Sequence, residues 1–277
     1  MPWSSEFPRP SRSLKGKAAI VTGAGSPAES LGNGRAISIL LAEDGASVLC
    51  VDINHSFAER TAEIIRSEGG NALAFKADVT SATDCEAVVA EAVRAFGRLD
   101  ILVNNVGIFG AQGTAVEVDI ESWKKSMDVN VTSLVLMTKY AVPAILKNER
   151  GDGGIRGSIV NMGSVAGLQG GHHSLLYPTS KGTVIQMTRA MAAHHGKDGI
   201  RVNTVCPGMM YTPMVGSGGE MSAETRESRR KRSLLKTEGN AWDAAASVRF
   251  LAGGDARWTT GTVLTVDAGA SSATLLN

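Results

Sequence analysis

The sequence predicts an α/β fold: one doubly wound domain with a seven-stranded parallel sheet and helices on both faces. Short apolar runs rich in β-branched residues alternate with longer segments of helical period along the chain. Strand, helix, strand at this spacing is typical of a parallel sheet. The composition, 43% hydrophobic and 20% charged over 277 residues, is that of a globular chain with a large core.

The expected strands are apolar runs of three to five residues, and in chain order they are Ala18–Val21, Ser47–Val51, Leu73–Phe75, Ile101–Val103, Ser158–Asn161, Arg201–Val205 and Thr262–Val266. The expected helices place apolar residues at i, i+3 and i+4, and they are Gly34–Glu43, Phe57–Ser67, Glu86–Phe96, Ile120–Leu146, Leu176–His195 and Trp242–Leu251. No repeat, linker or break in composition divides residues 14–277, so we expect one domain.

Three segments fall outside the alternation of strands and helices. Residues 1–13 contain Pro2, Pro8 and Pro10, and we expect a short disordered tail there. Residues 147–156 read as a surface loop. Residues 209–236 interrupt the alternation near its end, and a segment of this length in a compact domain is expected to form a lid over the substrate.

Charge and cysteine content exclude several classes of protein. Lys and Arg number 28 against 27 Asp and Glu, a net charge of +1, so we expect neither nucleic acid nor a membrane surface as a partner. No segment reaches about 18 consecutive apolar residues, and no signal peptide is evident. The widely spaced Cys50, Cys85 and Cys206 are odd in number, which favours buried thiols in a reducing, cytoplasmic environment.

A glycine-rich loop follows the first expected strand. It runs from Thr22-Gly23-Ala24-Gly25-Ser26 to Gly32-Asn33-Gly34, where a helix begins. Glycines in this place let a dinucleotide pyrophosphate approach the backbone and lie at a helix amino terminus, where free N–H groups favour negative charge. The spacing fits no standard G-x-G-x-x-G fingerprint, and a glycine-rich turn that closes a strand explains the loop equally well.

The second expected strand is followed by Asp52, eighteen residues beyond Gly34. A carboxylate at this strand end can accept hydrogen bonds from both hydroxyls of the adenosine ribose, and it would repel a 2′-phosphate. No Arg or Lys follows, because Ile53, Asn54 and His55 come next. The pattern favours NAD over NADP, although an ordinary turn aspartate is the alternative.

Tyr177 and Lys181 are four residues apart, which places them on one face of a helix. A cation about 4 Å from a phenol is worth up to about 4 kcal/mol at an effective dielectric of 20, so Lys181 is expected to lower the pKa of Tyr177. Ser164 ends an expected strand thirteen residues earlier, and Asn130 lies in an otherwise apolar helical stretch. Together these four residues predict a site for general acid/base catalysis.

From residue 14 to residue 270 the chain resembles the classical short-chain dehydrogenases/reductases, a family with a Rossmann-type fold. The resemblance depends on several motifs in the order of the family, namely the Thr22–Gly34 glycine loop, Asp78-Val79, Asn104-Asn105-Val106-Gly107, Asn130, Ser164, Tyr177 with Lys181, Pro207-Gly208 with Thr212, and Val266-Asp267. Gly32 and Gly34 match the later glycines of the family's loop, which is extended here. Val106 and Gly163 replace a common alanine and a common serine, and no function is assigned to either change.

The resemblance implies a role for each matched position. Tyr177 exchanges a proton with the substrate oxygen, Ser164 hydrogen-bonds that oxygen, Lys181 holds the nicotinamide ribose, and Asn130 positions a water near Lys181. The cofactor-binding positions that it implies are Gly23, Gly25, Ser26, Gly32, Asn33 and Gly34 for the phosphates, Asp52 and Ile53 for the ribose side, Asp78 and Val79 for the adenine, Asn105, Val106 and Gly107 for the backbone beside it, Tyr177 with Lys181, and Pro207, Gly208, Met210 and Thr212 for the nicotinamide.

The expected activity is that of an NAD-dependent oxidoreductase on a small-molecule secondary alcohol or ketone, with no metal. An NADPH-dependent ketoreductase and a nucleotide-binding protein without catalysis are the alternatives.

An apolar substrate is expected from the hydrophobic residues near the site, which are Ile108, Phe109, Val165, Leu168, Met209, Met210 and Met214. His172 and His173 read as a surface pair, and the Arg226–Arg232 run reads as a solvated helix face rather than a clamp for a phosphorylated substrate. The resemblance implies a homo-oligomer, a dimer or tetramer, formed through the helices 120–146 and 176–195, with the apolar carboxyl terminus, residues 273–276, in contact with the partner.

Overall fold

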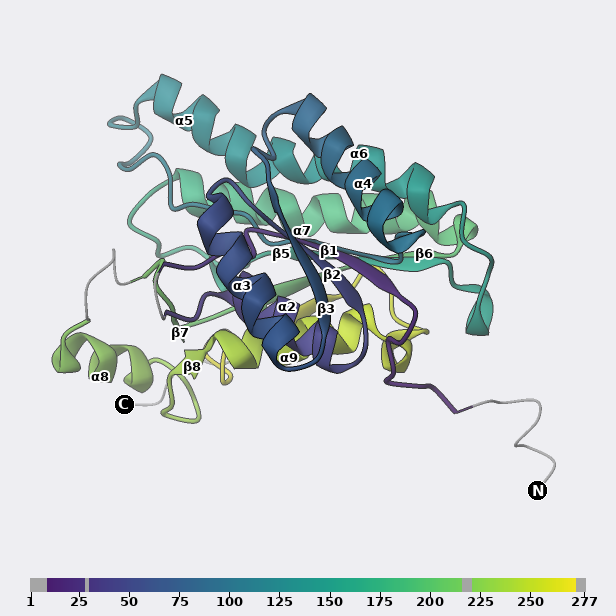
Figure 1. Cartoon of the computed structure of the whole chain (residues 1–277). Coiled ribbons are helices and arrows are strands. Elements are labelled where there is room, and N and C mark those ends of the chain that lie inside the picture. Colours follow the sequence, from purple (N-terminus) through teal and green to yellow (C-terminus); the bar gives the residue numbers. More distant parts are fainter. Residues whose placement is uncertain (1–8, 28–29, 216–220, 273–277) are drawn as a thin grey trace.

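A computed structural model describes residues 9–27, 30–215 and 221–272 of the chain. Its central feature is a seven-stranded parallel sheet (Figure 1). The strands of this sheet are β1 Ala18–Thr22, β2 Ser47–Asp52, β3 Asn71–Lys76, β4 Ile101–Asn104, β5 Gly157–Met162, β6 Ile200–Pro207 and β9 Val263–Val266. Their spatial order is β3-β2-β1-β4-β5-β6-β9, which confirms the predicted doubly wound fold.

Helices cover both faces of the sheet, and each face has its own hydrophobic core (Figure 1). One face carries α2 Asn33–Glu43, α3 His55–Ser67 and α9 Ala241–Ala252. The other carries α4 Ala82–Phe96, α5 Ile120–Met127, α6 Ser133–Ile145 and α7 Leu176–His195. Because both faces are covered, the strands read as nearly continuous apolar runs, and this is why their positions could be predicted.

The place of the functional site follows from the strand order. β1 pairs with β2 on one side and with β4 on the other, so the direction of winding reverses between β1 and β4. In open α/β sheets ligands bind at such a switch point, beyond the carboxyl ends of the strands. The glycine loop after β1 and the Asn105–Gly107 segment after β4 both lie at that edge.

Two helices begin earlier than their apolar period indicates, because polar side chains cap them. The Asn54 side chain accepts a hydrogen bond from the backbone of Ser56 at the start of α3. The Ser81 side chain accepts one from the backbone of Asp84 at the start of α4. These capping residues extend each helix beyond its first buried position.

The single helix expected over residues 120–146 is corrected by the structure. A π-helical turn, Asp128–Thr132, separates α5 from α6. Such turns add a residue to the helical repeat, and they are often found at functional sites. Asn130 lies inside this turn, so the residue that looked unfavourable in a helix marks the place where the helix is irregular.

The segments outside the alternation contain short elements of their own. Residues 209–236 include β7 Met210–Tyr211 and α8 Ala223–Lys231, and β7 pairs with β8 Gly239–Asn240. Most of the expected surface loop 147–156 is exposed, and it contains a 3-10 turn, Asp152–Gly154. Of the expected disordered tail, residues 1–8 lie outside the described residues, whereas residues 9–13 are described and Ser11 lies against Gly254. The residues 273–276 expected at a subunit contact also lie outside the described ranges.

One described helical stretch, Ile120–Leu146, is long and apolar enough to cross a membrane by length and composition. Buried core helices pass the same test. Met137, Ala141 and Ile145 of α6 lie in the core beside the sheet, and this packing accounts for the apolar composition.

Candidate active site

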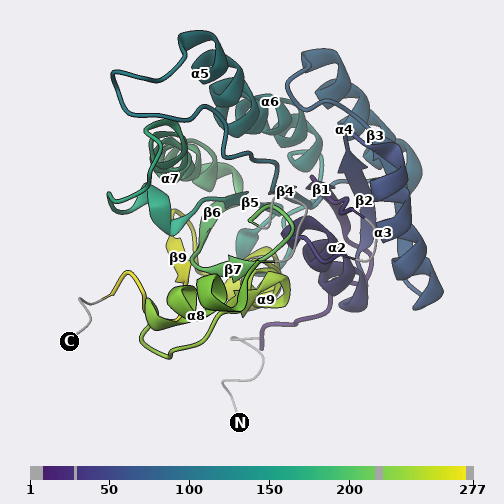
Figure 2. The same cartoon turned by 90° about the vertical axis from the view of Figure 1, so that its left-hand side faces the viewer.

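A cavity of ≈ 670 Å³ opens at the carboxyl-end edge of the sheet, on the side that carries β7 and α8 and faces the viewer in Figure 2. Ten of the predicted site residues line it: Asn33, Asn105, Gly107, Ser164, Tyr177, Lys181, Pro207, Gly208, Met210 and Thr212. They come from the ends of β4, β5 and β6, from the start of α2 and from α7. The structure therefore gathers residues that lie almost 180 positions apart in the sequence.

Tyr177, Ser164 and Lys181 form the chemical part of this cavity. Ser164 follows β5 with an extended backbone, and its hydroxyl accepts a hydrogen bond from the backbone N–H of Ala166 at 3.2 Å. Tyr177 and Lys181 lie one turn apart on α7, with the Lys181 ammonium 5.9 Å from the centre of the Tyr177 ring. That ammonium donates to the carbonyl oxygen of Met162, the last residue of β5, at 2.9 Å.

Burial sets the protonation of the two α7 side chains. It lowers the pKa of Lys181 to about 8. Burial also raises the pKa of Tyr177, and the nearby Ser164 hydroxyl opposes this shift. The expected net lowering of the Tyr177 pKa is therefore not observed, because desolvation of the phenol is the largest cause of its shift. At neutral pH Tyr177 is a neutral phenol, which can donate a proton.

Asn130 lies behind the cavity and does not line it. Its side-chain oxygen accepts from the Ile108 backbone N–H at 2.8 Å, and its amide nitrogen donates to the Ile108 carbonyl at 2.8 Å and to the Ser180 hydroxyl at 3.1 Å. Ser180 in turn donates to the Tyr177 carbonyl. The π turn thus ties the segment after β4 to the first turn of α7. The water expected beside Asn130 and Lys181 stays a prediction.

Gly107 lacks a side chain at the point where the backbone after β4 passes close to Lys181 and Asn130. A Cβ atom at position 107 would lie 3.0 Å from Lys181 Nζ and 3.6 Å from Asn130 Oδ1. A larger residue would crowd the ammonium that borders the cavity, so the glycine of the Asn105–Gly107 motif has a steric reason.

The glycine loop is closely packed against its surroundings. A Cβ at Gly34 would lie 1.9 Å from the Gly23 carbonyl oxygen, and one at Gly25 would lie 2.8 Å from an oxygen of Asp52. Gly25 donates its backbone N–H to that Asp52 carboxylate at 3.0 Å. Buried Arg35 of α2 donates to the carbonyls of Ser26 and Ser30, and so it holds both described ends of the loop.

The loop fits a bound dinucleotide on three observations. The N-cap of α2 is Gly32, which provides no side-chain hydrogen bond, so the first N–H groups of the helix have no side-chain cap. The first turn of α2 carries no acidic residue. A buried oxygen of the Asn33 side chain has no hydrogen-bond partner among the described residues, and Asn33 lines the cavity.

The remaining predicted cofactor residues do not line this cavity. They are Gly23, Gly25, Ser26, Gly32, Gly34, Asp52, Ile53, Asp78, Val79 and Val106. Asp52 and Asp78 still lie at the same sheet edge, since the Ala77 backbone N–H donates to the Asp52 carbonyl. The Asp78 carboxylate accepts from the backbone N–H and hydroxyl of Thr80, and Val79 is buried in the core. The structure brings the nicotinamide side of the predicted site together in one cavity and leaves the adenosine side on the adjoining edge.

The substrate side of the cavity is only partly as expected. Phe109, Val165, Met209, Met210 and Met214 line it, as predicted. Ile108 and Leu168 do not; their side chains are half exposed to solvent. An apolar residue near a motif does not by itself reveal which way its side chain points.

Sequence reasoning undervalued the His172-His173 pair. Both rings line the cavity, and they stack on each other at 4.3 Å between centres. The His172 ring lies 5.1 Å from the Tyr177 ring, which is also 5.1 Å from Phe109. Burial and the neighbouring His173 lower the pKa of His172. His172 is half-buried and His173 is exposed, so the pair lies at the surface, as predicted, and is also part of the wall of the cavity.

Two arginines of the Arg226–Arg232 run were also missed. Arg229 and Arg232 line the cavity. No residue of α8 is buried, so the predicted solvated helix face is confirmed, but the same run also borders the cavity. Within the described ranges no three His, Cys, Asp or Glu side chains are grouped so that they could hold a metal ion.

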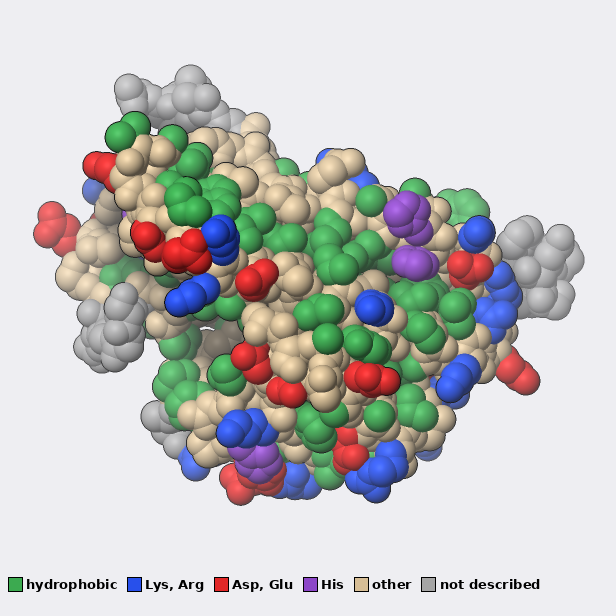
Figure 3. Space-filling model, turned by 90° about the horizontal axis from the view of Figure 1, so that it is seen from above, with side chains coloured by type: hydrophobic (Ala, Val, Ile, Leu, Met, Phe, Trp, Pro, Cys, Tyr) green, Lys and Arg blue, Asp and Glu red, His purple; other side chains and the backbone are tan. Residues whose placement is uncertain are grey.

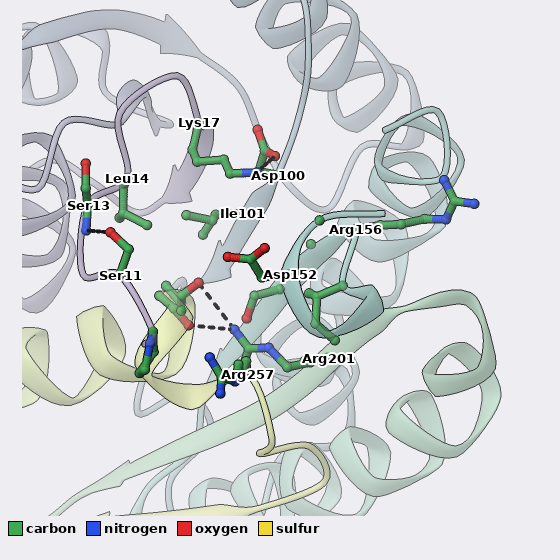
Figure 4. Close-up of a pocket in the computed structure, with 18 residues that line it drawn as sticks. Ser11, Ser13, Leu14, Lys17, Asp100, Ile101, Asp152, Arg156, Arg201 and Arg257 are labelled. Atoms are coloured by element: carbon green, nitrogen blue, oxygen red, sulfur yellow. Dashed lines mark hydrogen bonds and ion pairs between the residues drawn. The ribbon is translucent and has the colours of Figure 1, made fainter. Parts of the chain in front are cut away.

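A second cavity, of ≈ 360 Å³, lies at the opposite, amino-end edge of the sheet (Figure 4). Buried Arg201 of β6 borders it and donates to the carbonyls of Leu251, Ala252 and Gly253 at the end of α9. Lys17 pairs there with Asp100 at 3.1 Å. Caps of a helix carboxyl terminus and a paired carboxylate stabilise the fold, and the second cavity contains none of the predicted catalytic residues.

Comparisons with known proteins agree with this geometry. Residues 28–271 match a family model described as enoyl-(acyl carrier protein) reductase. The chain is 36% identical over 262 residues to 2-(S)-hydroxypropyl-CoM dehydrogenase 3 of Xanthobacter autotrophicus. This alignment covers 94% of this chain and 98% of that protein. A solved structure described as a short-chain dehydrogenase/reductase from Burkholderia xenovorans has a TM-score of 0.86 at 36% identity, with 95% of this chain and 99% of that chain covered. The structure of a 7 alpha-hydroxysteroid dehydrogenase complexed with NADH and 7-oxo glycochenodeoxycholic acid has a TM-score of 0.84 at 31% identity, and it covers 93% and 95% of the two chains.

Proposed function

The chain belongs to the classical short-chain dehydrogenase/reductase family of oxidoreductases, and we propose that it interconverts a secondary alcohol and a ketone with NAD as the cofactor. The observation that supports this most directly is the placement of Ser164, Tyr177 and Lys181 around one cavity at the switch point of the sheet. A neutral phenol beside a hydroxyl and an ammonium is suited to proton exchange with a carbonyl oxygen.

In the proposed reaction, the Tyr177 phenol donates its proton to the ketone oxygen as the alcohol forms, and it accepts the proton back in the reverse direction. Ser164 donates a hydrogen bond to the same oxygen and orients it toward the phenol. Lys181, close to both, favours the phenolate that Tyr177 becomes after it has given up its proton. The nicotinamide cofactor supplies or accepts the hydride. Asn130 acts indirectly, through its hydrogen bonds to Ile108 and Ser180.

The preference for NAD is proposed on the surroundings of Asp52. This carboxylate lies at the carboxyl end of β2 and accepts hydrogen bonds from the backbone N–H groups of Gly25 and Asn54. The following residue, Ile53, is 64% exposed and provides no cation. A carboxylate so placed is suited to the hydroxyls of a ribose and repels a 2′-phosphate.

The cofactor proposal is tested by steady-state kinetics with NADH and NADPH on the wild type and on Asp52→Ser. We expect a higher kcat/KM with NADH, and we expect Asp52→Ser to narrow the preference by about ten-fold or more, the cost of a lost hydrogen bond to a charged group. Asp44→Ser is the matched control, since Asp44 caps the carboxyl end of α2, at the other end of that helix from the glycine loop, and pairs with Arg249. A wild type that prefers NADPH would contradict the assignment and favour the ketoreductase alternative.

The substrate is proposed to be a small molecule with an apolar body. Phe109, Val165, Met209 and Met214 supply a largely hydrophobic wall next to Tyr177. Residues 209–236 provide several of these side chains, and we propose that this segment is the substrate lid.

We further propose a cytoplasmic homo-oligomer, a dimer or tetramer. Cys50, Cys85 and Cys206 are free and buried, which fits a reducing environment. The face formed by α4 to α7 carries apolar side chains between charged ones (Figure 3), and Ile120 and Val135 are among those exposed. Light scattering on the purified protein measures the subunit number, and a monomer at micromolar concentration would contradict this assignment.

A further inference from the structure

The arginines of α8 differ in how their charges are compensated. Arg226 and Arg229 each pair with one oxygen of Glu238, at 2.8 and 3.0 Å, and the Glu238 side chain is only 3% exposed. Arg230 pairs with Glu227 at 2.9 Å. In the described part of the chain, the side chain of Arg232 has neither a hydrogen-bond partner nor an ion-pair partner. Arg232, which is exposed to solvent, is therefore the one arginine of this run without an ion-pair partner among the described residues.

Arg232 is also one of the two α8-segment arginines that border the catalytic cavity. The other, Arg229, shares the single carboxylate of Glu238 with Arg226, and it donates to the Met210 carbonyl as well. Among the described residues the lining contains no Asp or Glu, whereas Lys181 adds a further cation. A cavity with an unpaired guanidinium and no carboxylate in its described wall attracts an anion.

We propose that Arg232 is a specificity-determining residue that binds an anionic group of the substrate, a carboxylate, sulfonate or phosphate, at a distance from the reacting carbonyl. This inference rests on the proposed function, and it adds a charged end to the apolar substrate. The apolar body lies against Phe109, Val165 and Met214, and the anion meets the guanidinium, whose planar fork matches such groups.

The cofactor also carries an anionic group, its pyrophosphate, and it could be the partner of Arg232 instead. The glycine loop and the uncapped start of α2 already offer backbone N–H groups to that pyrophosphate. Arg232 comes from a different part of the chain, in the segment that supplies Met209 and Met214 to the substrate side of the cavity. We therefore assign Arg232 to an anionic group of the substrate. The experiment below distinguishes this anion from the pyrophosphate of the cofactor.

The test compares two ketones that share an aromatic ring and an acetyl group, 4-acetylbenzoate and 4′-methylacetophenone, which differ in one charge. For the wild type we expect a higher kcat/KM with the carboxylate. In Arg232→Gln the ratio of the two kcat/KM values falls about ten- to a hundred-fold, the loss expected for one hydrogen bond to a charged group. Arg232→Lys, which retains the positive charge, should retain part of the preference for 4-acetylbenzoate. Arg230→Gln changes a half-buried arginine of α8 that is paired with Glu227, and it leaves the ratio as it is.

Two kinetic outcomes would overturn the proposal. One is a ratio that Arg232→Gln does not change. The other is a rise in the KM for NADH with no change in the ratio, because this would assign Arg232 to the pyrophosphate of the cofactor. Either result leaves the proposed oxidoreductase activity intact.

If neither ketone is reduced, the proposed function fails while the inference about Arg232 is still decided by binding. Isothermal titration of the protein with each ketone then measures the charge preference directly. A preference for 4-acetylbenzoate that Arg232→Gln removes supports the anion site. Equal affinities for the two ketones, or a preference that survives the substitution, overturn it.

Discussion

Two buried cations lie at opposite edges of the same sheet, and they have different functions. Lys181 borders the cavity at the carboxyl ends of the strands, and Arg201 borders the one at the amino ends. Each is 4% exposed. Burial lowers the pKa of Lys181 to about 8 and that of Arg201 to about 10. Burial and a shifted pKa alone therefore do not identify a catalytic cation.

The hydrogen bonds of Lys181 and Arg201 distinguish the catalytic cation from the structural one. Arg201 donates to three carbonyls at the end of α9 and to that of Thr259, so the negative end of a helix compensates its charge. Figure 4 shows those of these bonds that reach residues lining the cavity. Lys181 donates to one carbonyl, that of Met162, and lies beside a phenol and a hydroxyl that face the cavity. Arg201, whose N–H groups donate to several backbone carbonyls, stabilises the fold. Lys181 has N–H groups that are not engaged by the described part of the protein, and these are available to a substrate or cofactor.

The largest expected effect comes from Lys181→Met. The substitution removes the ammonium that favours the Tyr177 phenolate, so we expect kcat/KM to fall by about 10²- to 10⁴-fold. The free energy of unfolding at pH 7 should fall by less than about 1 kcal/mol, since the removal of a desolvated charge offsets the loss of the one hydrogen bond to the Met162 carbonyl. Urea unfolding and steady-state kinetics measure the two effects. A variant that is strongly destabilised would show that Lys181 is structural after all.

Arg201→Met is the matched substitution at the other edge, with the opposite result expected. It leaves carbonyls at the end of α9 without donors, so we expect the free energy of unfolding to fall by about 2–3 kcal/mol. Folded protein should retain kcat/KM within about two-fold, because Arg201 borders the other cavity. Loss of activity at full stability would remove the distinction between the two cations.

A smaller effect concerns pH. The pKa of Lys181 falls from 10.5 to about 8 on folding, so between these values the unfolded chain binds a proton that the folded chain does not. The free energy of unfolding contributed by Lys181 therefore rises with pH across this window, by about 3 kcal/mol. The three buried thiols have raised pKa values and act in the opposite direction above pH 9.

The contribution of Lys181 is isolated as a difference between two titrations of stability. Wild type minus Lys181→Met, measured by urea unfolding from pH 7 to pH 10.5, should slope upward. Parallel curves for the two proteins would contradict the shifted pKa of Lys181.

The sequence was most informative where buried strands and spaced motifs determine the structure. All seven strands and the convergence of Ser164, Tyr177 and Lys181 could be predicted, because parallel strands read as apolar runs and their ends share one edge. The π turn at Asn130 was signalled only as an unfavourable residue in a helix. The pKa of Tyr177 could not be predicted from spacing, since it depends on the burial of the phenol and on the nearby Ser164 hydroxyl.

The substrate side was the least predictable. Phe109 lines the cavity, but its neighbour Ile108 does not. This difference depends on the direction of the backbone after β4, which the periodicity of the sequence does not encode. Likewise, the charge pattern of α8 could not show that Glu238 pairs with Arg226 and Arg229 and leaves Arg232 unpaired. Such pairings are made between segments and follow from the tertiary fold.

The central claim, that Tyr177 is the proton donor of an NAD-dependent oxidoreductase, is tested most directly by the reduction of a ketone by NADH in the wild type and in Tyr177→Phe. The account predicts NADH oxidation by the wild type and a loss of at least about 10²-fold in kcat/KM for the variant, with NADH affinity and thermal stability retained. Turnover by Tyr177→Phe at a rate near that of the wild type would contradict it.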